Sequence, residues 1–426
     1  YASAQYGRIH VMNLDADNDA TAFKVIDEIY DTPNQLFDGS PQPGETGRQV
    51  TGIVFDPAST PTNQILYVSH SDPEIFEETE PGQSSVYPAS GRVTKLVLDG
   101  QANVVSQQDV VVGLPRSGEN HSPNGMEFGP DGWLYLSLGG NTNAGGQAKP
   151  FGYFPEVPLS GAIVRLDPGA IGATPVDVTA SSTFTFTDPC GSGESVGSGC
   201  SAAATVPTTI PNVPNKFELY ASGFRNGYDI AWHSNGSLYL NENNHNTGFG
   251  DTPDATTAPA GACAGPSSPV GNPPDKLFLV QQGAYHGHPN PSRGECVLFG
   301  GVQPIGEFQS KSSTTGLAEY TSNAVGPILK GQLLATNYAI GKNLQRVKLS
   351  ANGQQVLEKA DVATGLDSPI DVIVAPNGDI LVAEHNIAPS FASGRIKRIT
   401  PTLTNGFTSF GPQVDVDGDG YSDLLV

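Results

Sequence analysis

The sequence Gly-Met-Glu-Phe-Gly-Pro-Asp-Gly-Trp-Leu-Tyr-Leu-Ser, at residues 125–137, predicts two short strands joined by a tight turn. Asp-Gly is a turn dipeptide, and apolar and aromatic residues stand on both sides of it, which is typical of a β-hairpin. The same order of strand, turn and strand recurs at residues 52–70, 229–241, 371–383 and, in a weaker copy, 316–336. This repeat indicates the fold class.

A third strand follows several copies of the hairpin. The candidate third strands are residues 91–98, 161–166, 276–280, 343–349 and 394–399, and residues 7–12 are a similar strand without a hairpin before it. A repeated unit of three or four strands that cannot bury both of its faces alone is typical of a propeller blade. We therefore predict an all-β protein, a six-bladed β-propeller of four-stranded antiparallel blades, over residues 1–400. A β-sandwich is the alternative.

The composition argues against several classes of function. The chain has 426 residues, and 21 Lys and Arg stand against 43 Asp and Glu, which gives a net charge of −22. Such a surface repels the phosphates of nucleic acids and of anionic membranes. We expect no membrane span either, because no apolar run approaches the roughly 18 residues that a span needs. The many carboxylates are compatible with calcium, although solubility alone also explains them.

The four cysteines are expected to form two disulfides. Cys190 and Cys200 bracket a loop rich in Gly and Ser, and Cys263 and Cys296 flank another segment. Neither pair has the spacing of a zinc or dithiol motif, so the cysteines predict an oxidising compartment. Because the chain also begins at Tyr1 rather than at Met, we expect a processed, extracellular protein.

An acidic motif near the C-terminus predicts a calcium loop. Residues 415–423 read Asp-Val-Asp-Gly-Asp-Gly-Tyr-Ser-Asp, which places carboxylates and one main-chain carbonyl at ligand positions of such a loop. The expected ligands are Asp415, Asp417, Asp419, Tyr421 and Asp423. We interpret residues 413–426 as a partial calcium-binding module after a linker at 401–412, within a longer multidomain secreted protein. An unliganded acidic tail is the alternative.

Aligning the repeat on its first strand brings charged residues to one position. In successive copies this position holds Arg48, His121, Arg225, Ser312 and Asp367. Propeller blades surround a central channel, so we expect equivalent positions to gather at one mouth of it. Charged groups are costly to remove from water, and a His and an Arg at equivalent positions therefore favour a functional site over a structural role.

Loops after the second strands carry further candidates. Glu242 precedes Asn244 and His245, and residues 285–289 read Tyr-His-Gly-His-Pro. Imidazole and carboxylate groups can bind a metal or a cofactor, but they can equally hydrogen-bond the loops that carry them. The sequence contains no phosphate-binding loop or dinucleotide-binding fingerprint.

Two of these stretches resemble one known family. Residues 120–137, which begin Asn-His-Ser-Pro-Asn-Gly, are similar to the catalytic-histidine strand of soluble quinoprotein glucose/sorbosone dehydrogenases. Residues 221–232, which begin Ala-Ser-Gly-Phe-Arg-Asn-Gly, resemble the Gly-x-Arg-Asn strand of that family, and residues 283–289 loosely resemble its Gly-Asn-Tyr-Gly-Trp-Pro turn. The resemblance covers about residues 45–400. It implies a six-bladed propeller that binds pyrroloquinoline quinone (PQQ) and calcium.

The resemblance also implies roles for single residues. His121 would be the general base that takes the proton of the sugar C1 hydroxyl, and Arg225 would stabilise the negative charge on the cofactor. Asn226 would hydrogen-bond the cofactor. Further candidates for the cofactor site are Arg48, Tyr285, His286 and His288. Candidates for a calcium site in the propeller are Glu242 and Asp275.

The chain departs from the family where the carboxylates of PQQ would be held. The family uses one Lys and two Arg, and the corresponding positions here fall near Ala339 and at Ser368 and Ile370. Each lost charge-assisted hydrogen bond is worth about 1.5–3 kcal/mol. Two hypotheses therefore stay open beside an extracellular PQQ-dependent aldose dehydrogenase. One is a quinone-free propeller that binds or cleaves acidic polysaccharide, and the other is a calcium-dependent structural or adhesion module.

Overall fold

The computed structural model describes residues 1–3, 7–14, 20–36, 39–42, 44, 46–74, 87–179, 183–187, 203–207, 209, 213–254, 263, 265–385 and 394–401. The predicted calcium loop with Asp415, Asp417, Asp419, Tyr421 and Asp423 lies outside these residues, and so does the expected pair Cys190 and Cys200. In the part of the chain that is described, no helix is long and apolar enough to cross a membrane.

The chain folds into two compact units, and each is described by itself. Unit 1 comprises Tyr1–Gly227, His245–Gly271 and Gln282–Val302. Unit 2 comprises Tyr228–Asn244, Asn272–Gln281 and Gln303–Val426. The two stretches 245–271 and 282–302 flank one strand of unit 2 but belong to unit 1, so residues far apart in the sequence meet within each unit.

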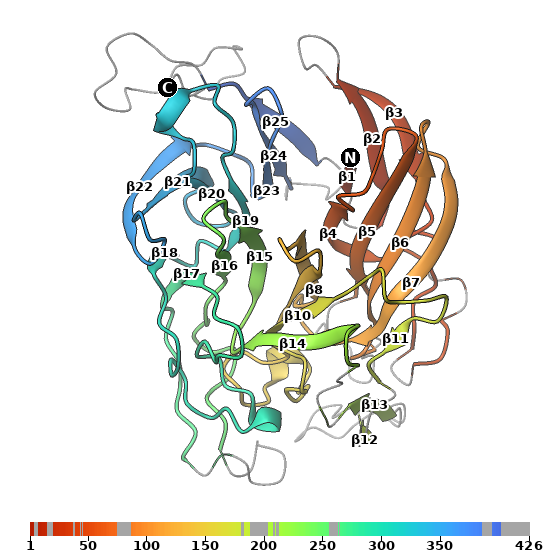
Figure 1. Ribbon diagram of the computed structural model, residues 1–426. Coiled ribbons are helices and arrows are strands. Elements are labelled where there is room, and N and C mark those ends of the chain that lie inside the picture. Colours follow the sequence, from red (N-terminus) through yellow and green to blue (C-terminus); the bar gives the residue numbers. More distant parts are fainter. Residues whose placement is uncertain are drawn as a thin grey trace. The chain divides into compact units, whose positions relative to one another are not determined.

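Unit 1 contains three large sheets and one separate hairpin (Figure 1). The first sheet has the order β1(Ala2–Ser3), β2(Ile9–Leu14), β3(Ala20–Ile26). The second has the order β11(Val176–Asp177), β7(Val104–Leu114), β6(Gly91–Asp99), β5(Asn63–Ser71), β4(Gln49–Phe55). The third has the order β14(Phe217–Ser222), β10(Ala162–Leu166), β9(Leu134–Leu138), β8(Pro123–Phe128). The hairpin consists of β12(Thr183–Thr187) and β13(Ala203–Pro207).

Unit 2 contains three sheets whose strands follow one another in sequence order. The first consists of β15(Gly227–Trp232), β16(Leu238–Glu242), β17(Pro274–Leu279), β18(Gly306–Ser310). The second consists of β19(Thr314–Glu319), β20(Leu333–Asn337), β21(Asn343–Leu349), β22(Val356–Ala363). The third consists of β23(Pro369–Val374), β24(Ile380–Glu384), β25(Arg395–Ile399). The described helices are single 3-10 turns, η1(Lys149–Phe151), η3(Pro291–Arg293) and η4(Gly326–Ile328).

These six sheets are the blades of an all-β, six-bladed propeller fold, as the repeat predicts. The hairpin expected at residues 125–137 is β8 and β9, which pair with Phe128 opposite Leu134 across the Asp-Gly turn. Blade size is more varied than predicted, because the sheets have three, four or five strands. The strand expected at residues 7–12 is β2, and it lies between β1 and β3 in a three-stranded sheet.

The interior strands β9, β16 and β20 are buried on both faces, which explains why their apolar residues run together. In β9 every residue of Leu134–Leu138 is buried, and Leu134, Leu136 and Leu138 join the largest hydrophobic cluster of unit 1. Burying one such side chain contributes about 1.5–3 kcal/mol. A glycine in the first strand permits the close packing of blades within a unit. A Cβ at Gly52 would lie 2.6 Å from the Asn124 carbonyl oxygen, and one at Gly316 would lie 2.6 Å from the Cα of Asp371.

Candidate functional site

The loop before β8 places His121 in a buried cluster of unit 1, whose other members are Arg225, Asn226, Glu156 and His288. The His121 amide donates to the Ser117 hydroxyl at 3.1 Å, and the Ser117 amide donates back to the His121 carbonyl at 3.0 Å. Arg116 fixes this loop, since its buried guanidinium donates to the main-chain carbonyls of Ser117 and Glu74 at 2.5 and 2.6 Å. Arg116 was not singled out from the sequence. Its function here is to hold the loop that carries His121.

The hydrogen bond of the His121 ring determines which nitrogen is basic. Nδ1 lies 2.8 Å from the carbonyl oxygen of Gly140, which can only accept, so Nδ1 carries the hydrogen and Nε2 carries the lone pair. The bond at Nδ1 is the one hydrogen bond that the His121 ring makes with the described residues. Burial, together with the positive charge of Arg225, holds the pKa of His121 well below its ordinary value of 6.5. His121 is therefore neutral, oriented and able to accept a proton at physiological pH.

Arg225 and Asn226 follow β14 and lie in the same cluster. The Arg225 side chain is 4% exposed, and its Nε donates to the Asn143 Oδ1 at 3.1 Å. Its main-chain carbonyl accepts from the Gly140 amide at 2.6 Å, and its guanidinium carbon lies 5.7 Å from the centre of the Phe151 ring. The same ring packs edge-on against His121, with the centroids 5.0 Å apart. The structure thus brings the predicted catalytic pair to one place.

Asn226 is oriented by a second amide. Its Oδ1 accepts from Asn124 Nδ2 at 2.8 Å, and that same Nδ2 lies 2.9 Å from the Gly227 carbonyl. This bond uses the oxygen end of the Asn226 amide, so the amide is fixed with its NH₂ group turned the other way. A donor held in this way suits the stabilisation of negative charge.

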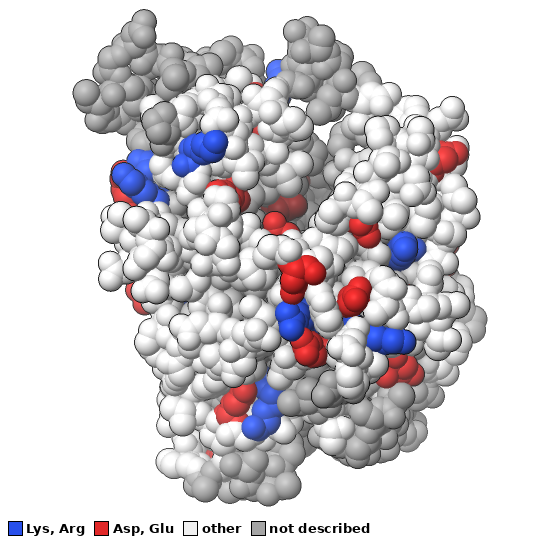
Figure 2. All heavy atoms as spheres, in the orientation of Figure 1, with Lys and Arg blue, Asp and Glu red and all other residues white. Residues whose placement is uncertain are grey.

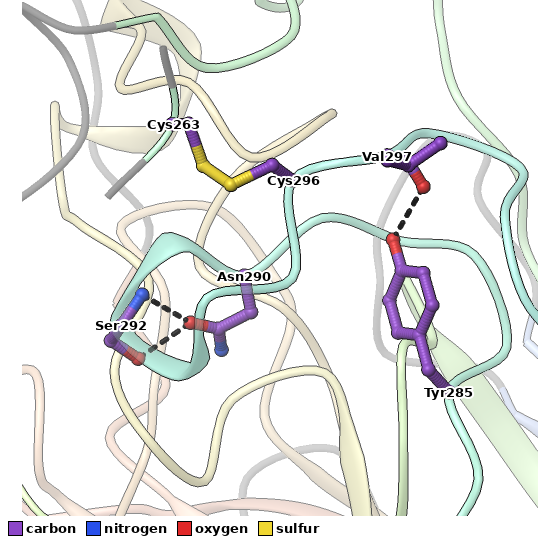
Figure 3. Close-up of a disulfide and its surroundings, with 6 residues drawn as sticks. All are labelled: Cys263, Tyr285, Asn290, Ser292, Cys296 and Val297. Atoms are coloured by element: carbon purple, nitrogen blue, oxygen red, sulfur yellow. Dashed lines mark hydrogen bonds between the residues drawn. A yellow bond between two sulfur atoms is a disulfide. The ribbon is translucent and has the colours of Figure 1, made fainter. Parts of the chain in front are cut away.

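Within the segment that contains Tyr285, His286 and His288, it is His288 that contacts Glu156. His288 is buried, and its Nε2 lies 2.9 Å from Glu156 Oε1. His286 instead stacks on Phe224 at 4.5 Å with its Nδ1 3.0 Å from the Ser222 carbonyl, and burial lowers its pKa to about 4. The Tyr285 hydroxyl donates to the Val297 carbonyl at 2.8 Å (Figure 3).

A disulfide holds this segment in unit 1. Cys263 and Cys296 are bonded, as the sequence predicts, with their Cα atoms 5.5 Å apart (Figure 3). Nearby, the Asn290 side chain accepts from the amide and the hydroxyl of Ser292 at 3.0 and 2.5 Å and so caps the turn η3. These bonds fix the loop that carries His288.

Glu156 belongs to the cluster although it was not identified from the sequence. Its carboxylate is fully buried, which by itself raises the pKa, yet hydrogen bonds from His288, Ser160 and Thr142 outweigh burial and lower the pKa of Glu156 below its ordinary value of 4.5. Glu156 is therefore charged at neutral pH. The only sequence signal near it is the Gly-Gly pair at residues 139–140, directly after β9, which marks a close approach of the backbone.

Arg48 lies in a different buried cluster of unit 1. Its guanidinium donates to His70 Nδ1 at 3.2 Å, to Asn34 Oδ1 at 3.0 Å and to the Ser90 carbonyl at 2.6 Å. Burial, followed by the charge of Arg92, lowers the pKa of Arg48 to about 9. Its three nitrogens therefore already have protein acceptors, and Arg48 braces the blade formed by β4 to β7.

The candidate calcium ligands Glu242 and Asp275 lie in unit 2. Asp275 Oδ1 accepts from the Asn244 amide at 2.9 Å, and Oδ2 accepts from the Ser312 hydroxyl at 3.0 Å and the Thr314 amide at 3.1 Å. The carboxylate thus joins the ends of β16, β17 and β19. Over the described ranges, no group of three or more His, Cys, Asp or Glu side chains could hold a metal ion.

The face drawn in Figure 2 carries separate charges rather than one basic patch. On the face seen in Figure 2, acidic side chains stand singly or next to one basic side chain among many uncharged ones. In unit 1, Arg165 pairs with Asp131 at 3.0 Å and with Glu218.

Comparisons with known proteins agree with the sheet topology. No family model and no curated protein matches the sequence. A solved glucose dehydrogenase is 18% identical over 83% of this chain and 83% of its own, with a TM-score of 0.50. A solved putative oxidoreductase (glucose dehydrogenase) from Thermus thermophilus is 17% identical over 92% and 93%, with a TM-score of 0.51. The PQQ-bound aldose sugar dehydrogenase of Streptomyces coelicolor is 15% identical over 91% and 87%, also with a TM-score of 0.51.

Likenesses at these identities concern the fold. The likeness extends over most of the chain. The fold of this chain is therefore the β-propeller fold of these solved sugar dehydrogenases.

Proposed function

We propose that this chain oxidises aldose sugars at C1, with PQQ and calcium as cofactors, and passes the electrons to an external acceptor outside the cell. The observation that carries the proposal is the pairing in unit 1 of a neutral His121, fixed at Nδ1 by the Gly140 carbonyl, with the buried guanidinium of Arg225. A base beside a fixed cation is the arrangement that removal of a proton and a hydride from one carbinol requires.

His121 acts as the base. The proton of the sugar C1 hydroxyl passes to Nε2, the C1–H bond breaks with its electron pair, and the C1–O bond becomes the carbonyl of a lactone. When bound, PQQ supplies the two-electron acceptor for that hydride. Because the Nδ1–H stays bonded to Gly140, the ring can take the proton without turning.

Arg225 and Asn226 stabilise the negative charge that develops during the reaction. Fixed donors in a buried site stabilise developing negative charge without reorganising, and removing one such donor typically costs about 2.7–4 kcal/mol of transition-state stabilisation. The Asn143 and Asn124 bonds keep both side chains in place before substrate arrives. These residues fit the reacting end of a quinone cofactor, because they combine a proton acceptor with hydrogen-bond donors.

The chain lacks charged residues at the positions expected to bind the carboxylates of PQQ. The positions that the resemblance assigns to them fall near Ala339 and at Ser368 and Ile370, which are uncharged, and Arg48 already uses its nitrogens. This observation favours a second candidate function, in which a quinone-free site around His121 and Arg225 binds or cleaves an acidic polysaccharide. A uronate carboxylate would then meet Arg225.

Titration calorimetry with PQQ on the calcium-loaded full chain tests the proposal, with dye-coupled sugar oxidation measured in parallel. We expect stoichiometric binding and turnover, and loss of turnover in His121→Ala and Arg225→Ala. The exposed residues His10 and Arg8 provide matched controls, His10→Ala and Arg8→Ala, that should behave as wild type.

Failure to bind PQQ at tens of micromolar would overturn the dehydrogenase. Cleavage of a uronate polymer by the same protein, abolished in His121→Ala, would then establish the second candidate.

Calcium is also part of the proposal. Its candidate ligands are Glu242 and Asp275 in unit 2, and the loop that begins at Asp415 is a separate candidate site. Chelation followed by calcium addition should abolish and restore turnover.

A further inference from the structure

Residues 139–143, the segment that follows β9, contact both members of the proposed catalytic pair. The Gly140 carbonyl binds His121 Nδ1 at 2.8 Å, and the Gly140 amide donates to the Arg225 carbonyl at 2.6 Å. Asn143 Oδ1 accepts from Arg225 Nε at 3.1 Å. The position of this short segment therefore sets the position of both side chains.

The segment is packed so closely that it cannot shift without disturbing the site. A Cβ added at Gly139 would lie 2.7 Å from the His121 Cβ, and one at Gly140 would lie 2.9 Å from His288 Nε2. These two positions need glycine because neighbouring side chains occupy the space. What anchors the segment from behind then decides how well His121 is oriented.

Glu156 is that anchor. Its Oε1 accepts from the Thr142 amide at 2.9 Å and from the Thr142 hydroxyl at 2.6 Å, and its Oε2 lies 3.2 Å from the Asn141 amide. These are consecutive amides, and they come directly after Gly140. Ser160 donates to Oε2 and His288 Nε2 lies 2.9 Å from Oε1, so the buried carboxylate meets five donor groups.

Burying the charged carboxylate of Glu156 costs free energy unless donors surround it. An ionised carboxylate in a protein interior costs several kcal/mol, and hydrogen bonds offset that cost only when they surround it. A loop could be fixed with neutral side chains at lower cost. The charged carboxylate binds two main-chain amides of residues 139–143 and so fixes the position of this segment. It thereby keeps the Gly140 carbonyl opposite His121 Nδ1.

We propose that Glu156 is a positioning residue of the catalytic site, which acts through residues 139–143 to orient His121 and Arg225. The kinetic part of this inference rests on the proposed function. The structural part concerns the tautomer of His121, which can be observed without any substrate or cofactor. A displacement of about 1 Å at a catalytic group can lower the rate about 100-fold, so a carboxylate remote from the chemistry can have a large effect.

The first test is Glu156→Gln in the full chain, because the amide is nearly isosteric but turns an NH₂ group toward donors. We expect kcat to fall about 10- to 100-fold with KM changed less than about 3-fold. In ¹⁵N spectra of the histidine rings, His121 of the wild type should be the Nδ1–H tautomer, and in the variant a mixture. The matched control is Glu218→Gln, a half-exposed carboxylate of unit 1 that pairs with Arg165.

Thr142 offers a second pair of variants if Glu156→Gln does not fold. Thr142→Val removes one hydroxyl donor from Glu156 and keeps the charge, whereas Thr142→Ser keeps the hydroxyl. We expect a several-fold loss of kcat in the Val variant and recovery in the Ser variant, with the His121 tautomer following the same order.

Two outcomes would overturn the inference. One is a single, unchanged His121 tautomer in folded Glu156→Gln or Thr142→Val. The other is an equal loss of kcat in Glu156→Gln and Glu218→Gln, which would indicate a general effect of stability. If the wild type has no dehydrogenase activity, the proposed function fails while the tautomer experiment still decides whether Glu156 positions His121.

Discussion

His121 and Arg48 occupy the same position of the repeat, five residues before the alignment point of a first strand, but their surroundings in unit 1 differ. All three guanidinium nitrogens of Arg48 and both ring nitrogens of His70 have partners: Arg48 Nε donates to His70 Nδ1, and His70 Nε2 lies 2.8 Å from the Thr94 hydroxyl. That hydroxyl in turn donates to Asp109 at 2.6 Å. Of the two ring nitrogens of His121, Nδ1 has a partner among the described residues and Nε2 has none.

The two clusters differ in whether the basic ring nitrogen of their histidine already has a hydrogen-bond donor. Both histidines are buried, and burial followed by a neighbouring arginine holds the pKa of each well below 6.5. Both rings are therefore neutral. In His70 the lone pair is consumed by Arg48, whereas in His121 the lone pair is on Nε2 and remains available. Burial and a lowered pKa do not by themselves identify a catalytic base. The ring nitrogen that carries the lone pair must also be without a hydrogen-bond donor from the protein.

The largest expected effect concerns the two histidines. His121→Ala should lower kcat/KM for sugar oxidation about 100- to 10,000-fold, because general base catalysis is worth that much. His70→Ala should leave kcat/KM of the folded protein within a few fold while lowering the free energy of unfolding, since it strands Arg48 Nε and the Thr94 hydroxyl. Steady-state kinetics and urea unfolding measure both, and equal losses of activity in the two folded variants would break the comparison.

The two arginines provide the next contrast. Arg225→Ala should reduce kcat about 100- to 1,000-fold, as loss of a donor to developing charge does. Arg48→Ala should instead lower the unfolding free energy by roughly 3 kcal/mol, because three buried acceptors lose their donor. If Arg48→Ala abolished PQQ binding in a folded protein, Arg48 would be a cofactor ligand after all, as the sequence first indicated.

The pH dependence of the rate sharpens the comparison further. The active form of His121 is neutral, and its pKa is lowered from 6.5 by burial, by Arg225, and also by His288 and Arg116, while the Gly140 carbonyl opposes this. The profile of kcat/KM should therefore stay flat from about pH 8 down through 6.5 and fall only at lower pH. An acid limb centred at or above pH 6.5 would mean that a group other than His121 is the base.

The smallest expected effect is on acid stability. The folded pKa of Glu156 is lower than the ordinary 4.5, so its contribution to stability is present above pH 4.5 and is lost as pH falls through the folded pKa. The difference in unfolding free energy between wild type and Glu156→Gln should accordingly shrink below pH 4.5. Urea midpoints measured at several pH values provide the check, and a difference that grows toward low pH would contradict it.

Much of the fold could be predicted because the pattern is local. Each copy of the repeat contains its own apolar runs, and three copies contain an Asp-Gly or Asn-Gly turn dipeptide. The pairs β8 with β9 and β23 with β24 could therefore be recognised without knowledge of the other strands. The fourth strands were missed. In β7 and β22 the burial alternates or is low over much of the strand, and such segments have little apolar signal to separate them from loops.

The candidate site could be predicted where a residue type stands at a repeated position or in a motif that resembles a known family. His121 and Arg225 come from repeated positions and Asn226 from the resemblance, and the structure brings the three together in unit 1. Glu156 lies 35 residues after His121 and has no repeat equivalent to draw attention to it. Its contact with His288 joins residues 132 positions apart, and no local pattern reports such a pairing.

Short stretches of the chain were enough to predict the all-β repeat, the Cys263–Cys296 pair and the residue types that can carry the chemistry, because turn preference, strand periodicity and side-chain chemistry are local properties. Which of the equivalent positions are open and which are saturated depends on packing between distant segments. Arg48 and His121 look alike in an alignment of the repeat, but hydrogen bonds from such segments saturate one and leave the other its lone pair. Partners of this kind are set in three dimensions, and the order of residues specifies them only through the complete fold.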